Sequence, residues 1–321
     1  MDKKKNFYFL MTFILSLTFL SSTLAAEKYP SREIQMIIPV PPGGALSIVI
    51  QFIKENFEKN LGVPSILNYQ AGGGGAIGPN MLAKSKPDGY TIGCLDSAKY
   101  LLLPATIPDV PFKYSDFDPL CKFFLSPQIL FCKGDAPWKT LEDLVTDAKK
   151  RPGQINYGAT TNSISQFIMM GFLESAGIKM LHVPTKAAGE TITRILGGNL
   201  DIGIVALTPL VGQLKAGELR GLFITTQRMS TFPQIPNLKE MGYPIVINLS
   251  YGFFAPLGMP KPVRETLTKA LEKTLQDPSL KKKLEEVESV LEYLPSEAFA
   301  KEVKDDYERL IKFVKTAGPQ K

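Results

Sequence analysis

Apolar and polar positions along the first third of the chain alternate between two periods. Short apolar runs at 35–40, 65–68 and 90–95 predict strands, and the segment 48–61 repeats its apolar residues at helical spacing. A shorter helix is predicted to end near Ser85. Strands that alternate with helices are typical of a parallel sheet with helices on its faces. Ligands of such sheets bind at the carboxyl ends of the strands, where the intervening loops lie.

A second alternating region begins after two adjoining apolar runs, 123–125 and 129–131, which leave no room for a helix between them. We interpret both runs as strands that lead into a second domain. Its predicted elements are a helix at 140–150 with Thr140 as N-cap, a strand at 155–158, a helix through Phe172, a strand at 179–183, a helix at 190–196, and strands at 201–205 and 219–225.

The last sixty residues are predicted to be almost wholly helical. The chain is expected to cross back to the first domain near 245–254, after which three amphipathic helices are predicted at 262–276, 278–288 and 296–316. These helices are expected to cover the first domain. The predicted division is therefore a discontinuous first domain of residues 26–125 and 250–321, and a second domain of residues 126–249.

Residues 1–25 have the pattern of a secretory signal peptide. Lys3, Lys4 and Lys5 precede an apolar run at 7–20, and small residues at 21–26 follow it. Cleavage after Ala25 is predicted, and cleavage after Ala26 is the alternative. The apolar core of about 14 residues is shorter than the roughly 20 that a membrane-spanning helix needs, which argues against a retained anchor. The mature protein is expected to act outside the cytoplasm.

Composition narrows the class of partner. With 44% apolar and 21% charged residues the chain is typical of a globular protein. Loss of residues 1–25 removes three lysines and Asp2, so the formal net charge of +6 falls to +4. The one basic run, 281–283, is followed at once by Glu285 and Glu286, which indicates a solvated helix face and no nucleic-acid patch.

The sequence has three cysteines, Cys94, Cys121 and Cys132, so at least one thiol is unpaired. Cys121 and Cys132 lie on the two adjoining apolar runs. The pattern is compatible with a disulfide between them and with two buried, unpaired thiols, because cysteine packs well as a small apolar residue.

A glycine-rich turn joins the first predicted strand to the first predicted helix. Its sequence, Val40-Pro41-Pro42-Gly43-Gly44-Ala45-Leu46-Ser47, places two glycines next to a helix N-terminus. Main-chain N–H groups at such a terminus bind anions well, because the helix dipole favours negative charge there. An anion-binding turn and an ordinary tight connection are the two interpretations.

Seven motifs in order along the mature chain resemble the extracytoplasmic solute receptors of tripartite tricarboxylate transporters, the Bug family. They are Pro42-Gly43-Gly44-Ala45, the glycine cluster 72–78, Pro87-Asp88-Gly89-Tyr90-Thr91, Pro152-Gly153 through Asn156-Tyr157-Gly158, His182-Val183-Pro184 with Lys186, Leu196-Gly197-Gly198, and Ala216-Gly217-Glu218-Leu219-Arg220. Each motif alone is weakly specific, whereas seven in register are specific.

The resemblance implies an α/β periplasmic binding protein of type II, the Venus flytrap kind, whose two lobes are each a mostly parallel sheet flanked by helices. It implies a monomer without cofactor, metal or nucleic-acid partner, and no enzymatic activity. The implied role is to hold a small di- or tricarboxylate or related organic acid between the lobes. The implied partner is a membrane permease of one large and one small subunit.

The resemblance also implies a set of ligand-binding residues. The first lobe would contribute its two glycine loops and the loop after the third strand, and the second lobe its hydroxyl-rich turn. The residues carried over are Gly43, Gly44, Ala45, Gly74, Gly75, Ser97, Asn162, Ser163 and Ser165. Relatives usually read glycine, any residue, glycine, then Thr or Ser where this chain has the turn around Ser163.

Two departures from the family bear on the ligand. Relatives commonly carry aspartate at the positions of Ser47 and Val205, so this chain lacks two carboxylates in the expected cleft. An ammonium group would find no countercharge and would face a desolvation cost of several kcal/mol, so a ligand without ammonium is predicted. Lys99 either offers a positive charge to a second carboxylate or points to solvent.

The principal alternative is a dinucleotide-binding enzyme. Gly73, Gly75 and Gly78 match G-x-G-x-x-G, and Asp96 ends the next strand where such folds place a ribose-binding carboxylate. Export, the short intervening helix and a strand that stops at Asn68 argue against it. His182, the one histidine, is expected to be a core residue. A signalling receptor is the third class.

Overall fold

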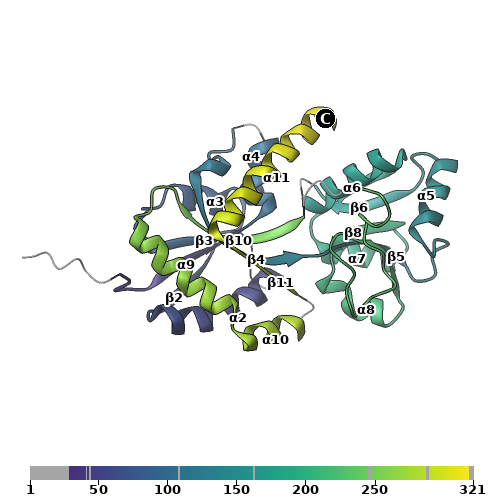
Figure 1. The fold of residues 1–321 in the computed structure, drawn as a ribbon. Coiled ribbons are helices and arrows are strands. Elements are labelled where there is room, and N and C mark those ends of the chain that lie inside the picture. The colour runs from purple at the N-terminus through teal and green to yellow at the C-terminus, as the bar shows by residue number, and fades with distance from the viewer. Residues whose placement is uncertain are drawn as a thin grey trace, which may run out of the picture.

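The computed structural model describes residues 29–40, 42, 45–107, 109–161, 163–244, 248–286 and 289–317. They form two α/β lobes that lie side by side, each built on one sheet (Figure 1). The two-lobed α/β class is therefore as predicted. The expected signal peptide lies outside the described residues.

Lobe 1 is built on a six-stranded sheet in the order β11-β4-β10-β3-β1-β2. Its elements are β1 (Ile34–Ile38), α2 (Ala45–Leu61), β2 (Ser65–Tyr69), the 3-10 turn η1 (Gly73–Gly75), α3 (Ile77–Ala83), β3 (Thr91–Asp96), the π-helical turn η2 (Ala98–Leu102), α4 (Leu103–Thr106), the 3-10 turn η3 (Tyr114–Asp116), β4 (Phe117–Ser126), β10 (Leu249–Pro256), α9 (Lys261–Leu275), α10 (Pro278–Glu286), β11 (Val290–Pro295) and α11 (Ser296–Ala317).

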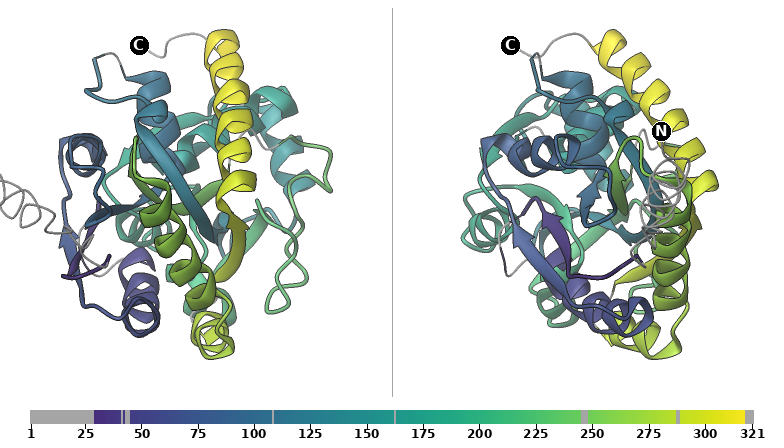
Figure 2. Two further views of the ribbon diagram at one scale, coloured as in Figure 1. Left: turned by 60° about the vertical axis from the view of Figure 1, so that its left-hand side comes forward. Right: turned by 90° about the vertical axis from the view of Figure 1, so that its left-hand side faces the viewer.

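Helices cover both faces of this sheet. One apolar cluster joins Ile53 and Phe57 of α2 to Leu271 of α9, and another joins Leu82 of α3 to Phe299 of α11. Figure 2 shows α2, in purple, and α11, in yellow, on opposite sides of the lobe. The apolar positions whose spacing predicted these helices thus lie on the face that each helix buries.

Lobe 2 is built on a five-stranded sheet in the order β7-β6-β8-β5-β9. Its elements are β5 (Gln128–Lys133), α5 (Leu141–Lys150), β6 (Asn156–Thr160), α6 (Ile164–Ala176), β7 (Leu181–Thr185), α7 (Ala188–Leu196), β8 (Ile202–Ala206), the 3-10 turn η4 (Thr208–Leu210), α8 (Val211–Lys215) and β9 (Leu219–Ile224). Thr140 caps α5 as predicted, since its side chain accepts a hydrogen bond from the backbone N–H of Asp143.

Both sheets are mixed, and most strands of each sheet run in one direction, as predicted. β1 is parallel to β2 and β3, but β10 is antiparallel to both of its neighbours, and β11 is antiparallel to β4. In lobe 2, β5 is antiparallel to β8 and β9. An apolar run indicates a buried strand without giving its direction.

β11 was missed, because the region after Pro260 was predicted to be helical. Half-buried Leu291 and Tyr293 alternate along this strand, which pairs with β4. Six residues at the edge of a sheet give too short a period-2 signal to stand out between two long helices.

The chain passes between the lobes at two places close together. β4 ends at Ser126 and β5 begins at Gln128, so only Pro127 separates a strand of lobe 1 from a strand of lobe 2. The return segment enters β10 at Leu249, which pairs with Ser126. In Figure 1, β4 reaches toward the second lobe. The two crossings therefore lie side by side.

All three cysteines are buried and unpaired. Cys121 lies in β4 of lobe 1 and Cys132 in β5 of lobe 2, so a disulfide between them is excluded. Burial raises the pKa of Cys132 to about 11, with Arg220 acting in the opposite direction. None of the described helices is both long and apolar enough to cross a bilayer.

Candidate functional site

A cavity of about 260 Å³ lies between the two lobes, and we call it the interlobe cavity. Lobe 1 and its crossing strand contribute Val40, Gly74, Asp96, Ala98, Lys99, Leu103, Leu249 and Tyr251, and lobe 2 contributes Thr160, Thr161, Ser163, Ile164 and Ser165. The lining residues come from β10 and from the carboxyl ends of β1, β2, β3 and β6 with the loops that follow them. These loops meet because parallel strands deliver their carboxyl ends to one edge.

The glycine loop forms part of the lobe 1 wall. Gly72, Gly73, Gly74 and Gly75 all have positive φ angles, between 57° and 116°, which side chains disfavour. Gly75 has a further reason to be glycine: a Cβ there would lie 3.1 Å from Cε of Lys99. The aliphatic stem of Lys99 therefore packs against this loop.

Lys99 is held in the cavity by Asp96. Its Nζ lies 3.1 Å from Oδ2 of Asp96, and its backbone N–H donates to Oδ1 at 3.2 Å. The side chain of Lys99 is 20% exposed and that of Asp96 only 3%. Lys99 is therefore neither a lysine that points freely to solvent nor a cation without a partner.

Hydroxyl groups and a helix N-terminus form the lobe 2 wall. Ser163 caps α6: its Oγ accepts from the backbone N–H of Gln166 at 3.3 Å and donates to the carbonyl of Thr160 at 2.6 Å. Oγ of Ser165 donates to Oε1 of Gln128 at 2.7 Å. The positive end of the thirteen-residue helix α6 thus faces the cavity, which favours an anion.

Gly74, Lys99, Ser163 and Ser165 are brought together in the cavity lining. Gly75 supports the lining through Lys99. Gly43, Gly44 and Asn162 lie outside the described residues, and Ala45 is the first residue of α2.

Three other predicted residues do not line the interlobe cavity. The hydroxyl of Ser47 lies 3.1 Å from that of Tyr69, and Val205 is buried in an apolar cluster opposite Ile129. Ser97 is fully buried: its Oγ donates to the carbonyl of Asn248 at 2.7 Å and accepts from the backbone N–H of Ser250. The hydroxyl of Ser97 therefore ties the third strand to the crossing segment.

Residues absent from the predicted set also line the cavity. Thr160 and Thr161 belong to the hydroxyl-rich turn that the sequence does display, so their signal was present. Tyr251 lies opposite Asp96 in the antiparallel pair of β10 and β3. Burial, with a contribution from Asp96, raises the pKa of Tyr251 well above its usual value. This pairing could not be predicted from local sequence patterns, since more than 150 residues separate Asp96 from Tyr251.

The dinucleotide-binding arrangement is not formed. The helix after the glycine loop, α3, has only seven residues, and the carboxylate of Asp96 is paired with Lys99. A Cβ on Gly78 would lie 2.8 Å from Cβ of Pro39, so this glycine permits close packing of α3 on the first loop. The third glycine of the motif thus has a packing role.

His182 is held by Ala159 and Gln166: its ring nitrogens lie 3.0 Å from the carbonyl of Ala159 and 3.3 Å from the amide nitrogen of Gln166. Both ring nitrogens therefore have partners, but this histidine is half-buried on the edge strand β7 and is not the core residue that was predicted. Among the described residues, no group of three His, Cys, Asp or Glu side chains is placed to hold a metal ion.

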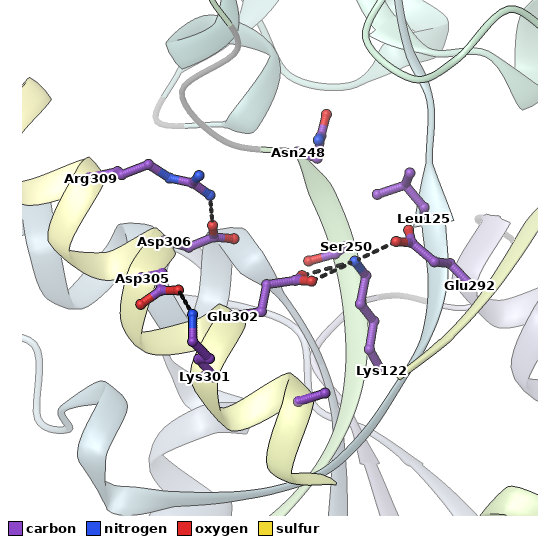
Figure 3. A pocket seen from close by; sticks show the side chains of 11 residues that line it. Lys122, Leu125, Asn248, Ser250, Glu292, Lys301, Glu302, Asp305, Asp306 and Arg309 are labelled. Carbon is purple, nitrogen blue, oxygen red and sulfur yellow. Dashed lines mark hydrogen bonds and ion pairs between the residues drawn. The ribbon is translucent and has the colours of Figure 1, made fainter. Parts of the chain in front are cut away.

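A second polar cavity, of about 440 Å³, lies beside α11, and we call it the α11 cavity. It is lined by Lys122, Leu125, Asn248, Ser250, Glu292, Ala298, Lys301, Glu302, Asp305, Asp306 and Arg309. Figure 3 shows its charged side chains pointing toward one another. Nζ of Lys122 lies 2.8 Å from Glu302 and 3.0 Å from Glu292, and Arg309 pairs with Asp306.

The interlobe cavity is a better candidate site than the α11 cavity, because loops of both lobes and the N-terminus of α6 supply its wall. The α11 cavity is walled by elements of lobe 1 and Asn248 of the crossing segment. Its cations are already paired with carboxylates of the same wall.

Comparison with known proteins identifies the family of the chain. Residues 49–318 match the model of the tripartite tricarboxylate transporter family receptor. The chain belongs to this family. It is similar to the protein BugT of Bordetella pertussis, with 29% identity over 262 residues that cover 80% of each chain. It is also similar to a solved periplasmic transporter, with 29% identity, a TM-score of 0.80 and coverage of 91% of this chain and 99% of that one.

An R. palustris protein solved with adipate shares the fold, with 23% identity, a TM-score of 0.79 and coverage of 90% of this chain and 98% of that one. Family membership makes the chain a solute-binding receptor and not an enzyme. Its relatives are periplasmic binding proteins that serve tripartite transporters.

Proposed function

We propose that this receptor captures a small organic carboxylate in the interlobe cavity and delivers it to a tripartite tricarboxylate-type permease of one large and one small subunit. The observation that carries the proposal is that a single cavity is lined by Gly74 of lobe 1 and Ser163 of lobe 2. Backbone N–H groups at the start of α6 and hydroxyls on the same turn are donors suited to a carboxylate.

Binding works through lobe closure. Donors on the two lobes reach one ligand together only when the lobes are close, so the ligand binds the closed form more tightly than the open form. The ligand shifts the equilibrium by no more than that difference in affinity. The permease then recognises the closed shape. The moving units that we propose are residues 26–125 with 250–321, and residues 126–249; the adjacent crossings at Pro127 and Leu249 support this division.

We also propose that the ligand has no ammonium group, for a reason that differs from the one the sequence gave. The sequence suggested a cleft without carboxylates, whereas Asp96 lines the interlobe cavity. Its carboxylate is already neutralised by Lys99 at 3.1 Å. An ammonium group would have to compete with Lys99 for Asp96, and the loser would be left unpaired in a partly buried site.

Three further expectations complete the proposal. Residues 1–25 are removed as a signal peptide, the mature protein is periplasmic, and it acts as a monomer. Mass spectrometry of protein recovered from the periplasm tests the cleavage after Ala25. Light scattering with and without ligand tests the monomeric state.

The central experiment is a thermal-shift screen of the mature chain against mono-, di- and tricarboxylates, followed by calorimetry. Adipate is a suitable first probe, because it has two carboxylates and no ammonium. We expect stabilisation by at least one unsubstituted carboxylate, and weaker binding of aspartate and glutamate than of their deaminated analogues. Tighter binding of an amino acid would overturn the ligand class, and binding of no carboxylate would overturn the function.

A further inference from the structure

Asp96 and Lys99 are the only charged side chains among the described residues that line the interlobe cavity. We infer that this pair sets the number of negative charges that the cavity accepts: one or two carboxylates bind, and a third is rejected. Asp96 is the specificity-determining residue. The inference rests on the proposed function and narrows its ligand class to mono- and dicarboxylates.

The geometry fixes the pair in place. Asp96 ends β3 and its side chain is almost fully buried, so the carboxylate cannot turn away into solvent. Lys99 is held by its ammonium on Asp96 and by its stem across Gly75, where Leu103 also packs. The cavity therefore keeps a fixed negative charge and a fixed positive charge within 3.1 Å of each other.

The charge limit follows from electrostatics. A lone lysine in this wall would attract each added carboxylate of a ligand, whereas Asp96 offsets that attraction because its carboxylate lies 3.1 Å from the ammonium of Lys99. The positive end of α6 and the hydroxyls of Thr160 and Thr161 remain as carboxylate donors. Partial charges of this size stabilise one or two carboxylates, and a third carboxylate approaches Asp96 without a free cation to meet it.

Tyr251 on β10 is the other titratable group in the described lining, and burial raises its pKa, as it raises those of Cys94 and Tyr100 nearby, so that all three are neutral. Asp306 and Glu302 lie in the α11 cavity and pair with cations there. The charge balance of the interlobe cavity therefore depends on Asp96 and Lys99.

The test uses three probes with the same five-carbon backbone: pentanoate, glutarate and 3-carboxyglutarate. Calorimetry gives the dissociation constant of each for the wild-type mature chain and for Asp96→Asn, Lys99→Met and the double variant. Asp96→Asn keeps an oxygen that can accept from the backbone N–H of Lys99, and Lys99→Met keeps the apolar stem over Gly75. Glu55→Gln, on the exposed side of α2, is the control for a change of net charge outside the cavity.

Wild type is expected to bind glutarate at least tenfold more tightly than 3-carboxyglutarate. Asp96→Asn is expected to shrink this preference about tenfold, because Lys99 then acts as an uncompensated cation. Lys99→Met is expected to weaken the binding of glutarate about tenfold and to change the binding of pentanoate less. The double variant is expected to restore the wild-type preference to within about threefold, as a charge rule requires.

A preference that stays within twofold of wild type in Asp96→Asn would overturn this inference, and so would wild-type protein that binds 3-carboxyglutarate most tightly. Should Asp96→Asn fail to fold, Lys99→Met provides the test. If Lys99→Met loses no more affinity for glutarate than for pentanoate, the charge of the pair does not control binding and the inference is wrong. A wild-type chain that binds none of the three probes and no other carboxylate of the thermal-shift screen would instead overturn the proposed function itself.

Discussion

β10 has a polar cavity on each side. Leu249 and Tyr251 face the interlobe cavity, and Asn248 and Ser250 face the α11 cavity, which is the alternation of a strand. The α11 cavity is the larger and the more heavily charged, yet its cations are paired with carboxylates of its own wall. The interlobe cavity has a single ion pair and many uncharged donors. The number of charged groups thus does not identify the site; the uncharged donors and the helix N-terminus in the wall do.

The largest expected effect is on the stability of the fold, and it comes from a residue of the α11 cavity. Lys122→Met removes the cation that is bonded to Glu302 and Glu292 and is only 5% exposed. We expect urea unfolding to show a loss of about 3 kcal/mol, at the low end for breaking a buried pair, since both glutamates reach solvent. Adipate affinity should change by less than about threefold.

Lys301→Met is the matched control in the same wall. Its ammonium pairs with Asp305 at the surface, so the free energy of unfolding should stay close to that of the wild type. A tenfold loss of adipate affinity in Lys122→Met would contradict the assignment of the α11 cavity to structure.

A second variant tests the link between the two cavities. Ser97→Ala removes the hydroxyl that bonds the carbonyl of Asn248 and the N–H of Ser250. We expect a loss of about 1–2 kcal/mol in the free energy of unfolding, because two buried backbone groups lose a partner. Adipate affinity should fall by less than threefold, and a greater loss without destabilisation would return Ser97 to the ligand-binding set.

Two helix caps of the same kind sharpen the comparison. Ser163→Ala at α6 and Thr140→Ala at α5 should each lower stability by about 1 kcal/mol. Ser163 lines the interlobe cavity and Thr140 does not, so only Ser163→Ala should weaken adipate binding, by roughly threefold to tenfold. Equal affinities in the two variants would remove Ser163 from the site.

The smallest expected effect is a pH dependence in the α11 cavity. Burial raises the pKa of Asp306 above its unfolded value, while Arg309 opposes the rise. The folded state therefore binds a proton more readily than the unfolded state, so the wild type gains stability relative to Asp306→Asn as pH falls through the folded pKa. Urea unfolding at about pH 7 and about pH 4 measures this difference.

Asp305→Asn should show the opposite sign. The hydrogen bond from Lys301 lowers the pKa of Asp305, against a weaker effect of desolvation. Its stabilising contribution is present above the unfolded pKa and is lost as pH falls through the folded pKa. The same slope in both variants would contradict the difference in burial between these neighbouring residues.

Much of the fold could be predicted from the sequence, because an amphipathic stretch of ten or more residues at helical spacing is compatible only with a helix. The helices at α2, α5, α9 and α11 were found at nearly their observed bounds. β11 was missed, since a short apolar run reports burial and not its neighbours. In the site, the family resemblance suggested Gly74 and Ser163, which line the interlobe cavity, and also Ser97 and Val205, which do not.

The sequence by itself determined the helices, the strands, the glycine loop and the hydroxyl-rich turn, because each depends on residues within a few positions of one another. Only the tertiary structure decided that Asp96 and Lys99 form the charged part of the interlobe cavity, and that Ser97 binds Asn248 instead of a ligand. These contacts are set by β10 inserting between β3 and β4, a pairing between residues about 150 positions apart that no local pattern encodes.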